Sequence, residues 1–170
     1  MLHRDFKPEN ILLDEHLNAF LADTGFAKAE QPDAPAKSTC LGFTHGYLDP
    51  SMVNGGKASA ATDGFAVGIT LLVVLTGRSP LGIIASCEDE FECDFEELDA
   101  VTLAKAGVGW PAGVARAIAQ LVLCRGVCLC HRSTRKRVPL DEVLRALTAL
   151  IDCADAPPKA RARRRRVRAT

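Results

Sequence analysis

The sequence lacks any apolar run long enough to cross a membrane. Its longest such run, FAVGITLLVVLT at 65–76, has 12 residues, whereas a spanning helix needs roughly 20. It also lacks a secretory signal, because His3, Arg4 and Asp5 stand where a short basic region and an apolar stretch would begin. No internal repeat is apparent. These absences predict an intracellular, cytoplasmic chain without a membrane span.

Complete disulfide pairing is excluded by the odd number of cysteines. The chain has seven of them, and a reducing compartment would keep all of them as thiols. Cys124, Cys128, Cys130 and His131 form the pattern C-x3-C-x-C-H, but this spacing fits no standard zinc finger. The favoured interpretation is therefore buried or half-buried free thiols, with a zinc site as the alternative.

Acidic residues are absent from the C-terminal segment 157–170, PPKARARRRRVRAT, which carries seven of the 21 basic residues. It also has no aromatic side chain that could stack on bases, which is typical of a disordered tail or a nuclear-import signal. Nucleic acid is therefore not expected as a partner beyond weak binding by this tail, and a nuclear location stays open. By contrast, residues 86–99 hold eight carboxylates, which predicts an exposed acidic loop leading into a helix.

The residue patterns predict a mostly α domain with a small β hairpin near its N-terminus. The apolar runs at 11–13 and 18–22, separated by DEHL, predict two short strands joined by a turn. Residues 28–58 show little periodicity and are predicted to be a long loop, and a helix is predicted to begin near Ser59. Two later helices are predicted because apolar residues recur every three or four positions: Val114, Ile118, Leu121 and Val122, then Leu140, Val143, Leu144, Leu147, Leu150 and Ile151.

Two motifs near the N-terminus carry a resemblance to a known family. LHRDFKPENILLD, followed by LADTGFAK, resembles the catalytic loop and metal-binding motif of eukaryotic protein kinases, HRDLxxxxN and DFG. FTHGYLDPS resembles the end of an activation segment, ATDGFAVGITLLVVLTGRSP the buried helix after it, and RKRVPLDEVLRAL the terminal helix region. The resemblance covers residues 2 to about 151. It is closest to receptor-like and interleukin-receptor-associated kinases, and Lys7 favours serine/threonine specificity.

The resemblance implies roles for four residues in phosphoryl transfer from ATP to a protein serine or threonine. Asp5 would accept or orient the proton of the substrate hydroxyl, and Lys7 would place positive charge near the transferred phosphate. Asn10 and Asp23 would hold Mg²⁺ against the nucleotide phosphates, because this ion prefers oxygen ligands. ATP and Mg²⁺ are thus the expected cofactors.

Further residues are implied to have structural roles. His3 and Arg4 would brace the catalytic loop and the activation segment, and Thr44 would contact Asp5. Asp63 would anchor the loop backbone from the start of the buried helix, with helix N-capping as the alternative role.

Two departures from the family pattern predict a weakened domain. Thr24 replaces the phenylalanine of DFG, so Thr24→Phe is expected to stabilise the lobe. Ser51 replaces the glutamate that ends the activation segment and pairs with an arginine, here Arg137. Loss of one partner of a buried pair costs about 3 to 5 kcal/mol unless something compensates.

The sequence contains no GxGxxG motif, and only Met1 and Leu2 stand before His3, so we expect that the chain has no N-terminal lobe. Residues 1–153 are therefore predicted to be the C-terminal lobe of a kinase domain and residues 154–170 a basic, disordered tail. The chain alone is expected to have little or no kinase activity. Three accounts stay open: a fragment of a kinase, an inactive pseudokinase-like binding or scaffold module, and a protein that acts through its basic tail.

Overall fold

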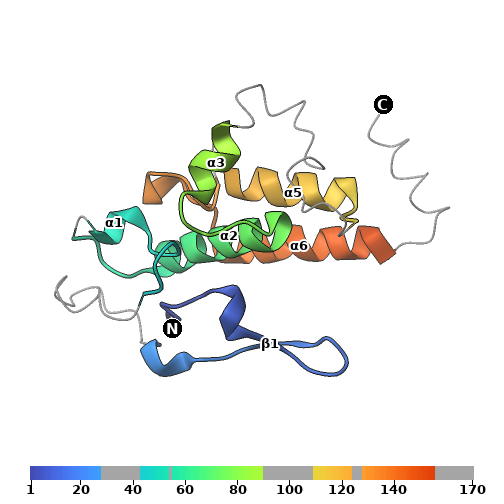
Figure 1. Ribbon diagram of the computed structural model, residues 1–170, viewed down its shortest axis with the longest axis horizontal. Helices are drawn as coiled ribbons and strands as arrows, with labels where there is room; N and C mark the ends of the chain where they lie inside the picture. The colour runs from blue at the N-terminus through green and yellow to red at the C-terminus, as the bar shows by residue number, and fades with distance from the viewer. Residues whose placement is uncertain (28–42, 54, 90–108, 124–127, 156–170) are drawn as a thin grey trace. The chain divides into compact units, whose positions relative to one another are not determined.

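The computed structural model of the chain describes residues 1–27, 43–53, 55–89, 109–123 and 128–155. These residues are mostly helical and include one two-stranded sheet, which confirms the predicted fold class (Figure 1). The chain divides into two units, Met1–Leu140 and Asp141–Thr170. Within the described ranges, no helix is both long and apolar enough to cross a membrane.

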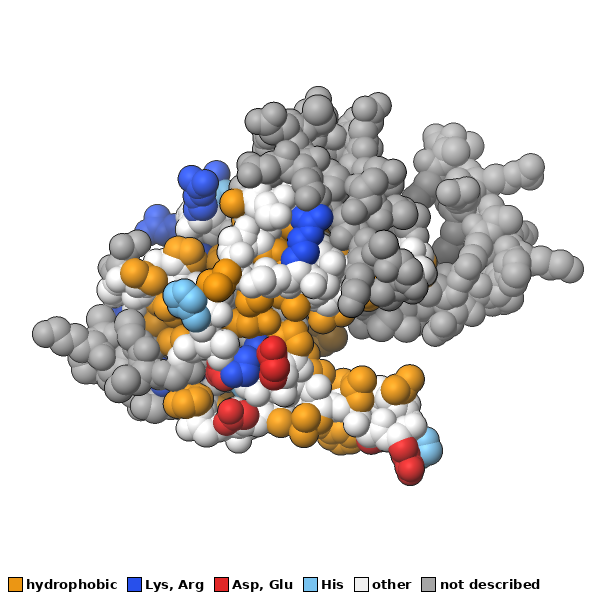
Figure 2. Space-filling view, in the orientation of Figure 1, with side chains coloured by type: hydrophobic (Ala, Val, Ile, Leu, Met, Phe, Trp, Pro, Cys, Tyr) orange, Lys and Arg blue, Asp and Glu red, His pale blue; other side chains and the backbone are white. Residues whose placement is uncertain are grey.

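The hairpin predicted near the N-terminus is confirmed. Strands β1 (Ile11–Leu13) and β2 (Ala19–Leu21) pair in antiparallel fashion. The Asp14 carboxylate closes the turn between them, because it accepts hydrogen bonds from the backbone and side-chain amides of Asn18 at 2.8 and 2.9 Å. Both strands leave large apolar side chains exposed, namely Leu12, Leu13, Phe20 and Leu21. Figure 2 shows apolar side chains at the surface of this face of the molecule.

Helix α2 (Ala60–Thr76) forms the centre of the first unit. Ser59 is its N-cap, which confirms the prediction that this helix begins near Ser59. The Ser59 N–H donates to Thr62 Oγ1 at 2.9 Å. The helix ends at Gly77, whose φ of 68° is a left-handed conformation that glycine adopts without a steric cost. Because α2 is apolar around most of its circumference, it is buried between other elements.

Helices α5 (Ala112–Leu123) and α3 (Ile83–Asp89) pack against α2 (Figure 1). The segment after α5 also approaches α2 closely at Gly68. A Cβ atom on Gly68 would lie 2.6 Å from Cys130 Sγ, which is closer than real Cβ contacts, and 3.0 Å from Leu129 Cβ, which is closer than most of them. A glycine at this position therefore lets residues 128–130 pack against the central helix.

The remaining elements confirm one predicted helix and change two predicted loops. Helix α6 (Leu140–Asp155) confirms the terminal helix and continues two residues into the predicted tail. The long loop predicted over 28–58 contains a short helix, α1 (Pro50–Val53), and residues 86–89 of the predicted acidic loop belong to α3. Residues 28–42, 90–99 and 156–170 lie outside the described residues.

Candidate functional site: the loop before β1

The backbone of the loop before β1 is fixed to α2 through a single carboxylate. Asp63, in the first turn of α2, accepts hydrogen bonds from the backbone N–H of His3 at 2.7 Å and of Arg4 at 3.0 Å. Arg4 has a φ of 72°, a left-handed conformation that costs energy for a residue with a side chain. Because Ser59 is the N-cap of α2, the Asp63 carboxylate remains available to hold the strained turn.

His3 and Arg4 extend this bracing to other parts of the site. His3 Nε2 lies 3.0 Å from the carbonyl oxygen of Ala22, and His3 Nδ1 accepts the N–H of Asp5 at 3.3 Å. The histidine ring therefore links the loop to the residue just before Asp23. The Arg4 guanidinium lies 5.7 Å from the centre of the Phe43 ring, a cation–π distance. Phe43 was not singled out in the sequence.

Asp5 is a buried carboxylate whose oxygens each receive two donors. Oδ1 accepts from Thr44 Oγ1 at 2.6 Å and from the Thr44 backbone N–H at 3.2 Å. Oδ2 accepts from Lys7 Nζ at 2.7 Å and from Asn10 Nδ2 at 3.2 Å. Since a carboxylate offers about four lone-pair sites, these donors fill its capacity. The predicted residues Asp5, Lys7, Asn10 and Thr44 thus form one cluster.

This cluster keeps Asp5 ionised. Burial raises the pKa of the Asp5 carboxyl, but the hydrogen bonds from Lys7, Thr44 and Asn10 and the charge of Lys7 together outweigh burial. The net result is a pKa below the ordinary value of 3.8. These contacts therefore stabilise the folded state above the unfolded pKa, and that contribution is lost as the pH falls through the folded pKa.

We expect a ¹³C NMR titration to place the midpoint of the Asp5 carboxyl below 3.8. In Lys7→Met the midpoint should rise, because the variant removes both a hydrogen bond and a positive charge from the carboxylate. Lys57→Met is a control, since Lys57 is not among the groups that shift the pKa of Asp5. A midpoint that is the same in the wild-type and Lys7→Met chains would contradict the assigned cause.

Asn10 and Asp23 offer oxygens suited to a hard cation. The Asn10 amide nitrogen donates to the Asp5 backbone oxygen at 2.7 Å as well as to its carboxylate. The Asn10 amide oxygen takes part in neither hydrogen bond. The Ala22 N–H donates to the Asn10 backbone oxygen at 2.8 Å. Because Asp23 directly follows Ala22, this hydrogen bond holds the backbone of Asp23 close to Asn10. Asp23 is exposed, with a φ of 55°. An amide oxygen and a carboxylate fit Mg²⁺, which takes few protein ligands and completes its shell with phosphates and water.

Arg137 lies in a second cluster, where the prediction of a missing carboxylate partner is wrong. Its guanidinium forms a buried ion pair with Asp49, and Nη2 donates to Asp49 Oδ1 at 2.9 Å. Arg137 also donates to the backbone oxygens of Ala61 at 3.0 Å and His131 at 2.9 Å. Asp49, two residues before Ser51, therefore takes the place of the glutamate that the chain lacks. A carboxylate so close to the end of the segment was the signal for this pairing.

Thr24 lies in a short 3₁₀ helix, Thr24–Phe26, and its side chain is exposed. The predicted stabilisation by Thr24→Phe assumed a packing site for the ring, and an exposed position provides none. Thr24→Phe is therefore expected to change the free energy of unfolding by no more than about 0.5 kcal/mol, as for an ordinary surface substitution. A urea unfolding curve measures the change, and a gain above about 1 kcal/mol would indicate that the ring does find a packing site.

The cysteine pattern near residue 130 remains only partly described. Cys128 and Cys130 are buried thiols without a disulfide, whereas Cys124 lies outside the described residues. Over the ranges that the structure covers, no group of three or more His, Cys, Asp or Glu residues is placed to hold a metal ion. The zinc alternative, which needs Cys124, is untested.

Comparison with known proteins agrees with the motifs and their geometry. Residues 1–146 match the protein kinase domain family. The lectin-domain containing receptor kinase VI.4 of Arabidopsis thaliana is 34% identical over 151 residues, covering 86% of this chain and 21% of the relative. The proline-rich receptor-like protein kinase PERK1 of the same plant is 32% identical over 164 residues, covering 91% of this chain and 25% of the relative. The chain thus spans about a fifth to a quarter of these relatives. It belongs to the protein kinase domain family, and its relatives are receptor-like kinases.

Proposed function

We propose that this chain carries the phosphoryl-transfer residues of a serine/threonine kinase, which moves the terminal phosphoryl group of ATP to a hydroxyl of a protein substrate. The observation that supports the proposal best is the cluster around Asp5. A buried, ionised carboxylate is held by a lysine, a threonine and an asparagine, and it lies in a loop whose strained backbone is anchored to the central helix.

Asp5 would orient the substrate hydroxyl and accept its proton as the phosphoryl group is transferred. Because four donors already occupy its oxygens, a substrate hydroxyl has to displace one of them. We expect Lys7 to be the donor that moves, since its long side chain is 19% exposed and its other hydrogen bond, to Thr44 Oγ1 at 2.7 Å, can break with it. Its ammonium group would then leave Oδ2 and turn toward the transferred phosphate, where positive charge stabilises the transition state.

Asn10 and Asp23 would hold the Mg²⁺ that accompanies ATP. When bound, this ion supplies positive charge that offsets the charge on the phosphate oxygens. Asn10 would have two roles, because its amide nitrogen holds Asp5 in position and its amide oxygen would be a ligand for the ion. Thr44 links the activation segment to Asp5 and so couples the substrate-binding side to the catalytic carboxylate.

The test is a phosphotransfer assay on a chimera, because the sequence contains no GxGxxG loop to cover the nucleotide. The residues of PERK1 that precede its matched segment would be joined to residues 1–170, and the phosphorylated amino acids identified after reaction with labelled ATP and a mixed protein substrate. We expect phosphoserine and phosphothreonine. Phosphotyrosine alone would refute the specificity. A folded chimera that transfers no phosphate would refute the reaction and favour a binding module.

A further inference from the structure

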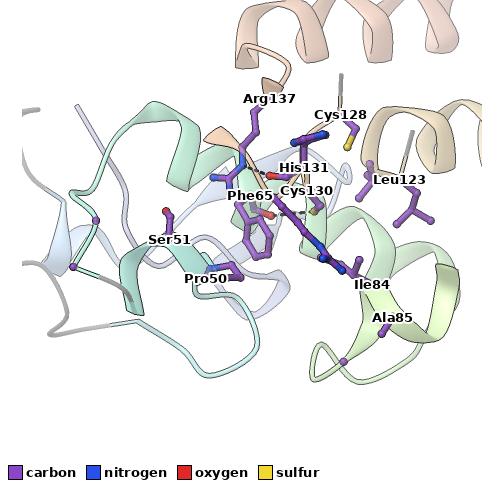
Figure 3. A pocket seen from close by; sticks show the side chains of 15 residues that line it. Pro50, Ser51, Phe65, Ile84, Ala85, Leu123, Cys128, Cys130, His131 and Arg137 are labelled. Atoms are coloured by element: carbon purple, nitrogen blue, oxygen red, sulfur yellow. Dashed lines mark hydrogen bonds between the residues drawn. The ribbon is translucent and has the colours of Figure 1, made fainter. Parts of the chain in front are cut away.

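A pocket of about 1020 Å³ lies in the first unit, away from the loop before β1. Most of its lining is apolar, and Figure 3 shows Phe65 of α2 between Pro50 on one side and Ile84 of α3 on the other. Leu123, at the end of α5, contributes to the far wall. A cavity of this size is at the upper end of the range for small-molecule sites, roughly 300 to 1,000 Å³.

The polar groups of this pocket are hydrogen-bond donors and cations. Among the residues that the structure describes, its lining includes His131, Arg132, Arg137 and Ser51 but no aspartate or glutamate. His131 Nδ1 accepts the Ser133 N–H at 2.9 Å, so the neutral ring carries its proton on Nε2 and can donate it. The Arg137 charge is already balanced by Asp49, whereas Arg132 is exposed. Arg132 therefore provides the pocket with a positive charge at its rim.

Ser51 contributes a short hydroxyl side chain to the lining of this pocket. The position corresponds to the glutamate of the resembling kinases, whose side chain would bring both bulk and negative charge to the lining. A serine provides neither, and Asp49 pairs with Arg137 in its place. The lining therefore keeps a short hydroxyl side chain where the family pattern has a carboxylate.

We propose that this pocket binds a small organic anion with an apolar body. The apolar part would lie against Phe65 and Ile84, where burial removes hydrocarbon surface from water. Its carboxylate, sulfonate or phosphate group would face Arg132 and the His131 Nε2–H, because charge-assisted hydrogen bonds to an anion are stronger than those between neutral groups. This binding is separate from phosphoryl transfer and needs none of the residues around Asp5.

Two fluorescent probes that share an aromatic body test the proposal on the complete 170-residue chain. 8-Anilino-1-naphthalenesulfonate carries the anionic group, and N-phenyl-1-naphthylamine lacks it. We expect the sulfonate to bind at one site and more tightly than the neutral probe. In Arg132→Gln, its affinity should fall by about five- to tenfold, equivalent to roughly 1 kcal/mol, while the affinity of the neutral probe stays the same.

Two more variants separate this pocket from other surfaces. Arg135→Gln is the matched control, because Arg135 is also exposed and lies nearby in sequence but does not line the pocket. Ala85→Trp fills the pocket from its rim and should abolish binding of both probes, with circular dichroism verifying an unchanged fold. The proposal is overturned if Arg132→Gln and Arg135→Gln bind the sulfonate equally well. It is also overturned if the Ala85→Trp chain keeps its fold and its binding, since the probes would then bind elsewhere, for instance on the exposed hairpin.

Discussion

Replacing Asp49 by alanine is expected to lower the free energy of unfolding by about 3 to 5 kcal/mol, because it leaves a buried charge unpaired. Both side chains of the Arg137–Asp49 pair are at most 2% exposed. Arg137 also donates to two backbone carbonyl oxygens and lies 5.1 Å from the centre of the Phe65 ring, and none of these partners carries a full negative charge. The pair also joins segments 88 residues apart in the sequence, so its loss should affect the whole first unit. Urea unfolding followed by circular dichroism measures the effect.

The chain offers a matched control and a rescue for this variant. Arg145 and Asp141 form an ion pair within α6, with both side chains 71% exposed, and Asp141→Ala should cost only about 0.3 to 0.5 kcal/mol. Adding Ser51→Glu to Asp49→Ala should recover part of the lost stability, because it returns a carboxylate to the position that carries one in the resembling kinases. If Asp49→Ala costs no more than Asp141→Ala, the buried pair does not have the structural role assigned to it.

Replacing Asp5 by alanine in the PERK1 chimera is expected to reduce kcat by about 10² to 10⁴, the contribution typical of a positioned general base. The variant removes the group that orients the substrate hydroxyl and also the shared acceptor of Lys7, Thr44 and Asn10. The KM for ATP should change less, because no nucleotide contact is assigned to Asp5.

Asp14→Ala provides the control for this experiment. Asp14 is also a carboxylate with several donors, but these lie within the hairpin turn. Its removal should leave kcat within about twofold of wild type, since surface changes away from a site have small effects. Equal activity of Asp5→Ala and the unmodified chimera would remove Asp5 from the reaction.

The parts of the fold that were predictable from sequence are those specified by local patterns. The hairpin follows from two apolar triplets around a polar turn, and its Asp14 and Asn18 close that turn. Helix α2 follows from an apolar stretch preceded by Ser59 and followed by Gly77. The residues of the loop before β1 were identified by their resemblance to the catalytic-loop and DFG motifs of protein kinases, and their catalytic roles are part of the proposed function.

What the sequence did not reveal depends on contacts between distant segments. The Arg137–Asp49 pair spans 88 residues. The family motif has its arginine-binding carboxylate at the position of Ser51, so the motif gave no reason to expect Asp49 as the partner of Arg137. The exposure of Thr24 also depends on tertiary structure, because the identity of a residue does not determine whether other side chains surround it in the fold. Helix α3 was missed because the eight carboxylates of residues 86–99 indicated an exposed loop, whereas the helix buries Ile83 and Cys87.

The most direct test of the phosphoryl-transfer account is NMR of the 170-residue chain during addition of Mn²⁺ with ATP, where Mn²⁺ stands in for Mg²⁺ and broadens nearby signals. We predict broadening of the Asn10 and Gly25 amide signals in the wild-type chain and none in Asp23→Ala. Signals from the carboxylate-rich segment 88–99 should broaden equally in both chains, as an internal reference for ion binding. If the Asn10 and Gly25 signals respond identically in the wild-type and Asp23→Ala chains, the loop before β1 is not the metal–nucleotide site that the account requires.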